Sequence, residues 1–482
     1  MIEYRPLLFI IGILLSVLAL LLLVPAIVDI FAQNNDWVAF LMSAFLTAFV
    51  GISLILTNKT ETFNLNIKQA FLLTTLSWTL IAAFGALPFV FSEQKLSYTD
   101  AFFETMSGIT TTGASVMFNL DKMPPGILLW RSLLTGMGGI GIIVFALAIL
   151  PMLKVAGMQL FKTESSDKSD KIMPRMTQIS LAITIVYFSL FGLCAFGFWL
   201  AGMSAFDAIA HSFPIISTAG YATHDAGFAY WDNSYIDYIA VVFMILSALP
   251  FVLYVQLARG EGEAFLKDEQ VKWFLSIVFI AIAIMTLWLI MEKNYDFSKS
   301  LRYASFSVVS LITTTGFANT DFALWGTFAD AFLFMLIVIG GCTGGTTGGI
   351  KIFRFQILYQ TAKTQLIQLI QPHAIVRMRY NGKAIPDGVT SSVMSFIILY
   401  GFAFMMVAII LAFCGMDFIS SMSASATCLS NTGPGLGTSV GPMGNYAHVP
   451  NLGKWALSFA MLLGRLEIFT ILVLFTPKFW RD

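Results

Sequence analysis

The segment DAFFETMSGITTTGAS, residues 100–115, decides the fold: a short, partly apolar stretch runs into three threonines and then a glycine, Gly113. Three further segments have the same form: DAIAHSFPIISTAGYAT (207–223), YASFSVVSLITTTGFAN (303–319) and SSMSASATCLSNTGPGLG (420–437). Each is too short to cross a bilayer, which takes about 20 apolar residues. A unit that returns at regular intervals of about 100 residues indicates an internal repeat.

Long apolar runs surround these four segments. Of the 482 residues, 57% are hydrophobic and only 11% are charged, and the mean hydropathy is +0.82. Since about a quarter of the residues of a soluble protein are charged, this composition indicates a membrane protein. Hydropathy predicts ten membrane-spanning helices. They lie near residues 7–31, 36–57, 70–92, 126–152, 177–201, 235–258, 273–292, 326–358, 390–414 and 453–477.

The repeat organises these spans. Eight of them pair around the four segments, and the first two remain as an N-terminal addition. We therefore predict an all-α polytopic membrane protein with four parallel helix–pore-loop–helix repeats around a central pore. The predicted divisions are 1–65 for the two-helix addition and 66–175, 176–270, 271–385 and 386–482 for the four pore repeats.

The charged residues orient the chain. Most of the 27 Lys and Arg residues, Lys351 among them, fall at the span ends that lie away from the four segments. The positive-inside rule then places both termini in the cytoplasm and the four loops on the outer side. The formal net charge of zero indicates no nucleic-acid partner. The four cysteines lie in apolar segments without CxxC spacing, which favours buried free thiols.

The four loops have the composition of a cation filter. Non-helical backbone within a bilayer is tolerated where it is buried in protein or lines a water-filled cavity. A ring of carbonyl oxygens can replace the hydration shell of a weakly hydrated monovalent cation. No Asp or Glu lies in the loops, which argues against a divalent ion. The predicted filter residues are Thr111, Thr112, Gly113, Thr218, Ala219, Gly220, Thr314, Thr315, Gly316, Asn431, Thr432 and Gly433.

A half-helix precedes each loop, and its C-terminal end carries a partial negative charge that favours a cation at the pore centre. Asp100 and Asp207 begin the first two half-helices, where we interpret them as caps, whereas Tyr303 and Ser420 hold the corresponding positions in the other two. His211, in the second half-helix, shows no ligand spacing and is expected to be a packed side chain.

The TTTG, STAG, TTTG and SNTG segments of these loops resemble the Trk/Ktr/HKT superfamily of potassium transporters. The resemblance covers the whole chain, and the two additional N-terminal spans are similar to the bacterial Trk membrane subunits rather than to the shorter Ktr subunit. It implies potassium uptake across the bacterial inner membrane. Members that admit sodium often have serine in the first loop, so Gly113 favours potassium. Asn431 departs from the Thr or Ser of the other loops.

A glycine-rich stretch, IGGCTGGTTGGIK (residues 339–351), interrupts the predicted span 326–358. It is no phosphate-binding loop, because Ile350 holds the place of the lysine and no strand precedes it. So many glycines disfavour a regular helix. The resemblance implies a gate under the filter, and close packing of small residues against a neighbouring helix is the alternative. The glycines concerned are Gly340, Gly341, Gly344, Gly345, Gly348 and Gly349.

Arg465 lies deep within the last predicted span. An ionisable side chain at such depth is costly and usually faces the protein interior or a water-filled path. Glu467 lies about 200° further around a continuous helix, which precludes a direct pair. The resemblance places Arg465 just below the filter as part of the gate, and packing against another carboxylate is the alternative.

The loops at 153–176 and 359–389 are too short for a regulatory domain. The resemblance implies a TrkA-like cytosolic ring that carries the nucleotide (ATP, ADP or NAD), and a homodimer of this subunit in the lipid bilayer. We expect K⁺ as the transported ion, no covalently bound cofactor and no enzymatic activity, since no catalytic constellation appears. A sodium- or proton-coupled symporter of the same superfamily is the alternative. A transporter of organic solutes is disfavoured, because the repeats are parallel and their centres uncharged.

Overall fold

The computed structural model describes residues 3–59, 65–148, 172–374, 376–386 and 388–481. Within these ranges the chain is almost wholly helical, and one short antiparallel hairpin pairs β1 (Arg379–Tyr380) with β2 (Lys383–Ala384). The prediction of an all-α fold is confirmed.

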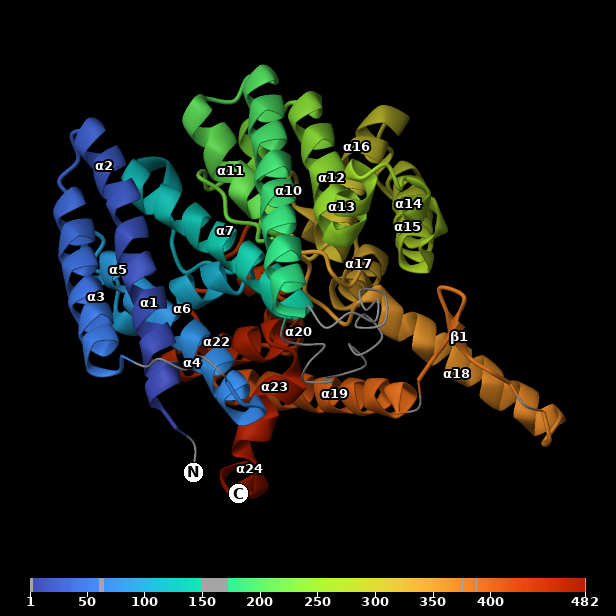
Figure 1. Ribbon diagram of the computed structural model, residues 1–482. Coiled ribbons are helices and arrows are strands. Elements are labelled where there is room, and N and C mark those ends of the chain that lie inside the picture. Colours follow the sequence, from blue (N-terminus) through green and yellow to red (C-terminus); the bar gives the residue numbers. More distant parts are fainter. Residues whose placement is uncertain (1–2, 60–64, 149–171, 375, 387, 482) are drawn as a thin grey trace.

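The helices follow one another repeat by repeat (Figure 1). The N-terminal addition contains α1 (Arg5–Leu21), α2 (Leu23–Phe31) and α3 (Trp37–Thr57). Next come α4 (Ile67–Gly85), α5 (Leu87–Phe91), α6 (Tyr98–Ile109), the 3-10 turn η1 (Leu120–Lys122) and α7 (Pro125–Ala148). The second repeat contains α10 (Ile172–Leu200), α11 (Ala205–Ser217), η2 (Gly227–Tyr230), α12 (Ser234–Ala248) and α13 (Phe251–Ala258).

After α14 (Glu263–Lys267), the third repeat contains α15 (Glu269–Lys293), α16 (Phe297–Ile312), η3 (Phe322–Trp325), α17 (Thr327–Ile339) and α18 (Ile352–Ile370). The fourth contains α19 (Val389–Phe413), α20 (Phe418–Ser430), α21 (Gly437–Val440), α22 (Asn451–Arg465), α23 (Ile468–Leu472), η4 (Val473–Phe475) and α24 (Pro477–Trp480). Helix α18 extends away from the other helices, and the start of α1 and helix α24 lie at the same end of the molecule (Figure 1).

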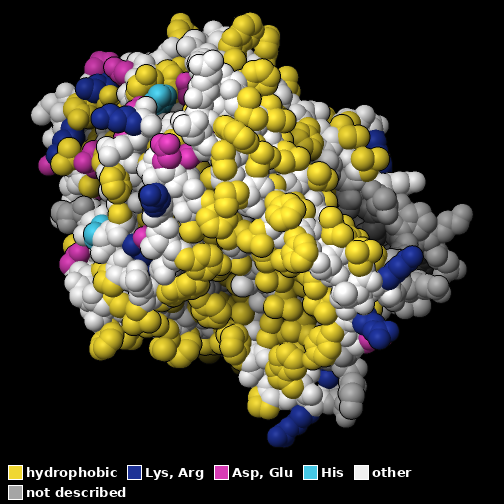
Figure 2. Space-filling model, turned by 90° about the vertical axis from the view of Figure 1, so that its left-hand side faces the viewer, with side chains coloured by type: hydrophobic (Ala, Val, Ile, Leu, Met, Phe, Trp, Pro, Cys, Tyr) yellow, Lys and Arg dark blue, Asp and Glu magenta, His cyan; other side chains and the backbone are white. Residues whose placement is uncertain are grey.

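Among the described residues, seven helices are long and apolar enough to cross a membrane, and two bent helix pairs would raise that number to nine. Together with the shorter apolar helix α17, they overlap with the ten segments that hydropathy predicts. The side of the molecule that carries the N-terminal helices presents a broad hydrophobic surface, and its charged side chains gather mainly toward the edges (Figure 2). Such a surface suits contact with lipid chains.

Two of the predicted spans are broken, which their hydropathy did not indicate. Helices α12 and α13 meet at 92°. Pro250 lacks a backbone N–H and keeps the residue before it out of the helical conformation, and Leu249 is extended accordingly (ψ 156°). In the last repeat, α22 and the segment from Ile468 meet at 113°. There Glu467 has a left-handed backbone (φ 60°).

Four half-helices, α6, α11, α16 and α20, have between 12 and 16 residues and are too short to cross a bilayer. Their first turns are capped by side chains that accept a backbone N–H, namely those of Ser97, Ser204, Asp296 and Asp417. Asp100 and Asp207 are therefore not the capping residues themselves. They lie in the first turn, and each carboxylate accepts the hydroxyl of the capping serine at 2.7 Å.

The N-terminal addition is attached to the first repeat by two carboxylates. The Asp29 side chain, fully buried, accepts the backbone N–H of Gly126 at 2.7 Å in the first turn of α7. Asp36 accepts the N–H of Glu93 at 2.9 Å. The first N–H groups of a helix have no acceptor within the helix. The Asp29 carboxylate, which comes from the N-terminal addition, is the acceptor for one of those of α7.

Replacing Asp29 by alanine is expected to lower the stability of the protein by about 1–2 kcal/mol, because it leaves the buried N–H of Gly126 unpaired. Asp29→Asn retains an acceptor oxygen and should lose less. The measurement is the midpoint of thermal unfolding in detergent, with Glu261→Ala as an exposed carboxylate control. Equal midpoints for Asp29→Ala and Glu261→Ala would contradict this role of Asp29.

Candidate ion pathway

The four loops that follow the half-helices meet in a closed ring. In each loop the glycine faces the carbonyl oxygen of the residue just before the glycine in the next loop, and the fourth loop returns to the first. The distances from a Cβ placed on the glycine to that oxygen are 1.9 Å (Gly113 to Ala219), 2.3 Å (Gly220 to Thr315), 1.9 Å (Gly316 to Thr432) and 2.5 Å (Gly433 to Thr112). No side chain fits in such a space, so the close approach of the next loop requires a glycine at each of these four positions.

All four loops have the same backbone conformation. The glycine and the residue two positions before it both have positive φ angles, an arrangement that L-residues adopt only where the surroundings enforce it. The pairs are Thr111 (53°) and Gly113 (81°), Thr218 (55°) and Gly220 (69°), Thr314 (55°) and Gly316 (82°), and Asn431 (57°) and Gly433 (93°). In every loop one residue separates the two left-handed positions. Thus the structure brings all twelve predicted filter residues together in one ring.

Side-chain hydrogen bonds hold the loops from behind. The hydroxyl groups of Thr110 and Thr112 lie 2.8 Å apart in the first loop, and the third loop has the same contact. Asn431, which breaks the fourfold pattern, donates from its amide to Thr112 Oγ1 (3.0 Å) and to the carbonyl of Met461 (2.9 Å). The asparagine therefore links the fourth loop to the first and to α22, which a threonine is too short to do.

The outer ends of the first two loops also meet. Nδ1 of His224, after the second loop, lies 2.5 Å from Asp121, after the first, and the imidazole stacks on Tyr230 at 3.6 Å. This hydrogen bond lowers the pKa of the Asp121 carboxyl. The contact joins the two segments on the side of the ring from which the half-helices enter.

On the opposite side, the glycine-rich segment between α17 and α18 packs directly against the ring. The N–H of Gly348 donates to Thr314 Oγ1 at 2.8 Å, and the N–H of Gly349 donates to the carbonyl of Ser430 at 2.9 Å. A Cβ on Gly348 would lie 2.0 Å from that same carbonyl oxygen. The segment therefore lies directly against the third and fourth loops of the ring.

The rest of this segment fills the break between α12 and α13. The carbonyl groups of Ser247 and Ala248 accept the N–H groups of Thr346 (3.1 Å) and Cys342 (3.0 Å), and Gly344 accepts that of Phe251 (2.9 Å). The close packing against a neighbouring helix is thus present in part of the segment, and the gate stays a prediction. Gly341 and Gly345 pack closely against α12, whereas Gly348 and Gly349 lie against the ring.

Arg465, at the end of α22, is buried beside this segment and donates from Nη1 to the carbonyl of Thr346 at 2.8 Å. Among the described residues, its Nε and Nη2 have no hydrogen-bond partner. The alternative of a carboxylate packed against Arg465 is therefore wrong. Glu467 pairs with Arg354 instead, at 2.5 Å. The helix ends at Arg465, so the two side chains are kept apart by the break and not by helical phase.

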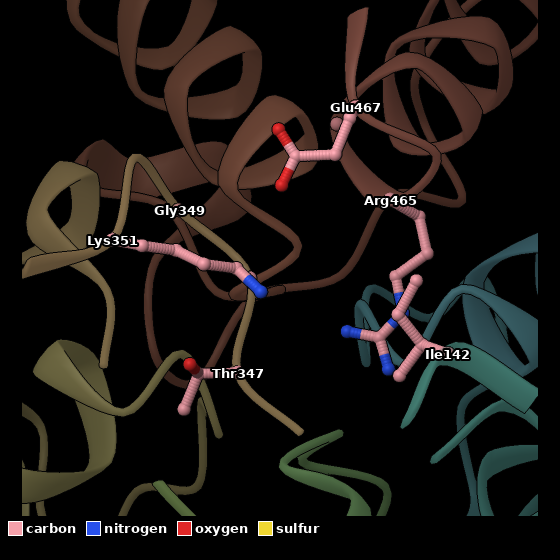
Figure 3. A pocket seen from close by; sticks show the side chains of 8 residues that line it. Ile142, Thr347, Gly349, Lys351, Arg465 and Glu467 are labelled. Atoms are coloured by element: carbon pink, nitrogen blue, oxygen red, sulfur yellow. The ribbon is translucent and has the colours of Figure 1, made fainter. Parts of the chain in front are cut away.

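Lys351 is a site residue that the sequence analysis missed. It was assigned to the cytoplasmic end of a span, yet it is buried (6% exposed), and its left-handed backbone (φ 76°) directs it inward. Lys351 and Arg465 point into the same small cavity from different sides (Figure 3). The cavity is lined by Ile142, Thr347, Gly348, Gly349, Lys351, Gly464, Arg465 and Glu467. The available signal was the position of Lys351 two residues after the last glycine of the run, Gly349.

A polytopic helical membrane protein whose four re-entrant loops form one ring belongs to the pore-loop class of membrane transport proteins. The family model of TrkH, described as a cation transport protein, matches residues 37–482, and the chain belongs to this family. The resemblance to the Trk/Ktr/HKT superfamily is thereby confirmed.

Several relatives match over their full length. The Trk system potassium uptake protein TrkI of Halomonas elongata is 41% identical to this chain, and the match covers 100% of this chain and 98% of TrkI. The Trk system potassium uptake protein TrkH of Escherichia coli K12 is 36% identical over 100% of both chains. The crystal structure of the potassium transporter TrkH from Vibrio parahaemolyticus has a TM-score of 0.92, with 36% identity and 100% of both chains covered.

Replacing Gly113 by serine is expected to lower the preference for K⁺ over Na⁺, because the new Cβ would displace the carbonyl of Ala219 and strain a left-handed backbone. The measurement is the ratio of the two permeabilities in proteoliposomes. Gly192→Ser is the matched control, since no atom lies within 4 Å of the position of its Cβ. An unchanged ratio in Gly113→Ser would show that the ring does not select the ion.

Proposed function

We propose that this protein takes up potassium across the bacterial inner membrane through the ring of four loops, by a channel-like pathway. The observation that carries the proposal is the closed ring itself, in which four backbones of the same conformation rest on one another. Such a ring offers carbonyl oxygens in place of water to a monovalent cation. The relatives named above as potassium uptake proteins support the choice of K⁺.

The buried side-chain oxygens of the ring support the same function. Among the described residues, Thr111 Oγ1, Asn431 Oδ1 and Thr432 Oγ1 have no hydrogen-bond partner. A buried polar oxygen without a partner costs about 1–3 kcal/mol, a cost that an ion or a water molecule in the pathway would offset. We assign K⁺ to this site, and no covalently bound cofactor.

We further propose that the glycine-rich segment, Lys351 and Arg465 form a gate beneath the filter. A K⁺ ion about 4 Å from either charge would be repelled by about 4 kcal/mol at an effective dielectric constant of about 20. The segment also lies against the third and fourth loops, so conduction requires it to move. Its hydrogen bonds to Ser247 and Ala248 tie any such movement to the break in α12.

The proposal includes an orientation and partners. We place both termini and the positively charged span ends in the cytoplasm, in accord with the positive-inside rule. We propose a homodimer in the lipid bilayer and a TrkA-like cytosolic ring that binds the nucleotide and moves the gate. The relatives are named as parts of a Trk system, which fits a subunit with partners. Transport, and not enzymatic catalysis, is the activity we assign.

The test is ion flux through the purified protein in proteoliposomes. A K⁺ gradient should drive a flux that an equal Na⁺ gradient does not. A reversal potential that follows the K⁺ gradient alone would support a channel-like pathway. A reversal potential that shifts with an imposed pH or Na⁺ gradient would instead support the alternative, a coupled symporter. Equal K⁺ and Na⁺ fluxes would contradict potassium selectivity.

Replacing Arg465 by alanine is expected to raise ion flux by at least severalfold, because it removes one of the two positive charges that repel the cation, while Lys351 remains. The measurement is the initial rate of ⁸⁶Rb⁺ uptake into proteoliposomes. Arg465→Lys retains the charge and is the matched control, which should stay near the wild-type rate. If Arg465→Ala and Arg465→Lys give the same rate, the charge of Arg465 is not a barrier.

A further inference from the structure

Two fully buried charges lie behind the first loop and have no part in the gate. Glu104 is in the half-helix α6 and Arg131 in α7, with exposures of 0% and 2%, and Arg131 Nε lies 2.8 Å from Glu104 Oε1. Removing such a pair from water costs free energy that the mutual attraction often fails to recover. Buried charges at membrane depth usually have a functional role.

The pair holds the segment that leaves the first loop. The Glu104 carboxylate accepts the N–H of Val116 at 2.9 Å and the hydroxyl of Ser115 at 3.0 Å. Arg131 Nη2 lies 3.1 Å from the same serine oxygen. Ser115 and Val116 follow Gly113 by two and three residues, so the ion pair fixes the chain where it leaves the loop.

The pair also reaches the second loop. Arg131 Nη1 donates to the carbonyl of Ala222 at 2.8 Å, and the guanidinium group lies over the ring of Tyr221 at 4.2 Å. The Tyr221 hydroxyl donates to the backbone carbonyl of Glu104 at 2.6 Å. Tyr221 and Ala222 directly follow Gly220. One ion pair therefore connects the ends of two neighbouring loops.

The second repeat has an uncharged counterpart. His211 lies as far before Gly220 as Glu104 lies before Gly113. Its Nε2 lies 3.4 Å from the backbone nitrogen of Thr223. This contact corresponds to the one in which Glu104 accepts the N–H of Val116. The equivalent positions in the other two repeats are Ser307 and Ala424. Among the residues that the structure describes, an acidic group at this position of the half-helix occurs in the first repeat alone.

We propose that the Glu104–Arg131 ion pair is a positioning element that sets the spacing between the first and second loops and thereby determines the preference for K⁺ over Na⁺. This inference rests on the proposed function of the ring. Gly113 lies directly against the carbonyl of Ala219, so a shift of the first loop relative to the second changes the spacing of the ring oxygens. The number and spacing of these oxygens decide which ion the ring accepts.

The experiment compares Glu104→Gln, Arg131→Met and the double variant Glu104→Gln/Arg131→Met in the full-length protein. Each single variant should raise the Na⁺/K⁺ permeability ratio in proteoliposomes by about tenfold, which corresponds to about 1.4 kcal/mol. Each should also unfold at a lower temperature in detergent, because one buried charge is left unpaired. The exposed pair Glu263 and Lys267 supplies the control, Glu263→Gln/Lys267→Met, which should change neither quantity.

The double variant separates positioning from stability. With no unpaired charge, its unfolding temperature should recover toward that of the wild type. Its permeability ratio should stay altered, because methionine donates no hydrogen bond to Ala222. A double variant that recovers both quantities would overturn the proposal, since the pair would then be only structural.

A milder change keeps the test valid if the charge variants fail to fold. Tyr221→Phe removes one hydroxyl from the link between the loops and should raise the Na⁺/K⁺ ratio by about twofold to threefold, the effect of somewhat less than 1 kcal/mol. If the wild type is selective and Tyr221→Phe has the same Na⁺/K⁺ ratio, the Glu104–Arg131 pair does not position the two loops. Equal permeabilities for K⁺ and Na⁺ in the wild type would instead contradict the proposed function of the ring.

Discussion

The contact of four backbones at one point is the constraint on which the rest of this structure depends. Each loop glycine lies against a carbonyl oxygen of the next loop, at distances that leave no room for a Cβ. Backbone groups within a membrane need partners that lipid cannot supply. The carbonyl groups at the ends of the half-helices supply partners for N–H groups of the loops, and the outer helices surround the ring. The ring thus determines where eight of the predicted spans must lie.

The irregular segments beneath the ring follow from the same need. A broken span leaves backbone N–H and carbonyl groups without partners in its own helix. In this protein the groups at the α12–α13 break and those of the glycine-rich segment form hydrogen bonds with each other. Ser247 and Ala248, at the end of α12, accept N–H groups from the glycine-rich segment between α17 and α18. That segment in turn donates to Thr314 and Ser430 in the ring. Any displacement of the segment therefore breaks hydrogen bonds in two other repeats, which makes it an element with defined positions rather than a loose loop.

Charge is placed unequally around the ring. Beneath it, Arg465 and Lys351 point into one cavity, and among the described residues no carboxylate pairs with Arg465. The gate that we propose depends on these two positive charges. Behind the ring, the Glu104 and Arg131 charges neutralise each other and serve geometry instead. The fourfold backbone therefore carries side chains that are not fourfold. The backbone of the ring follows the fourfold repeat, whereas the charged side chains around it differ from one repeat to the next.

The sequence by itself determined the class of fold, the four loops, their glycines and the glycine-rich interruption, because span length, hydropathy and repeat spacing are local properties of the chain. Arg465 stood out because a charge in an apolar run is visible without a structure. The tertiary structure alone decided that Lys351 turns inward, that α12 and α22 end in sharp bends, and that Glu467 pairs with Arg354. It also decided that Glu104 and Arg131 meet. These features depend on contacts between residues far apart in the chain and on single left-handed backbone angles, which neither composition nor periodicity records.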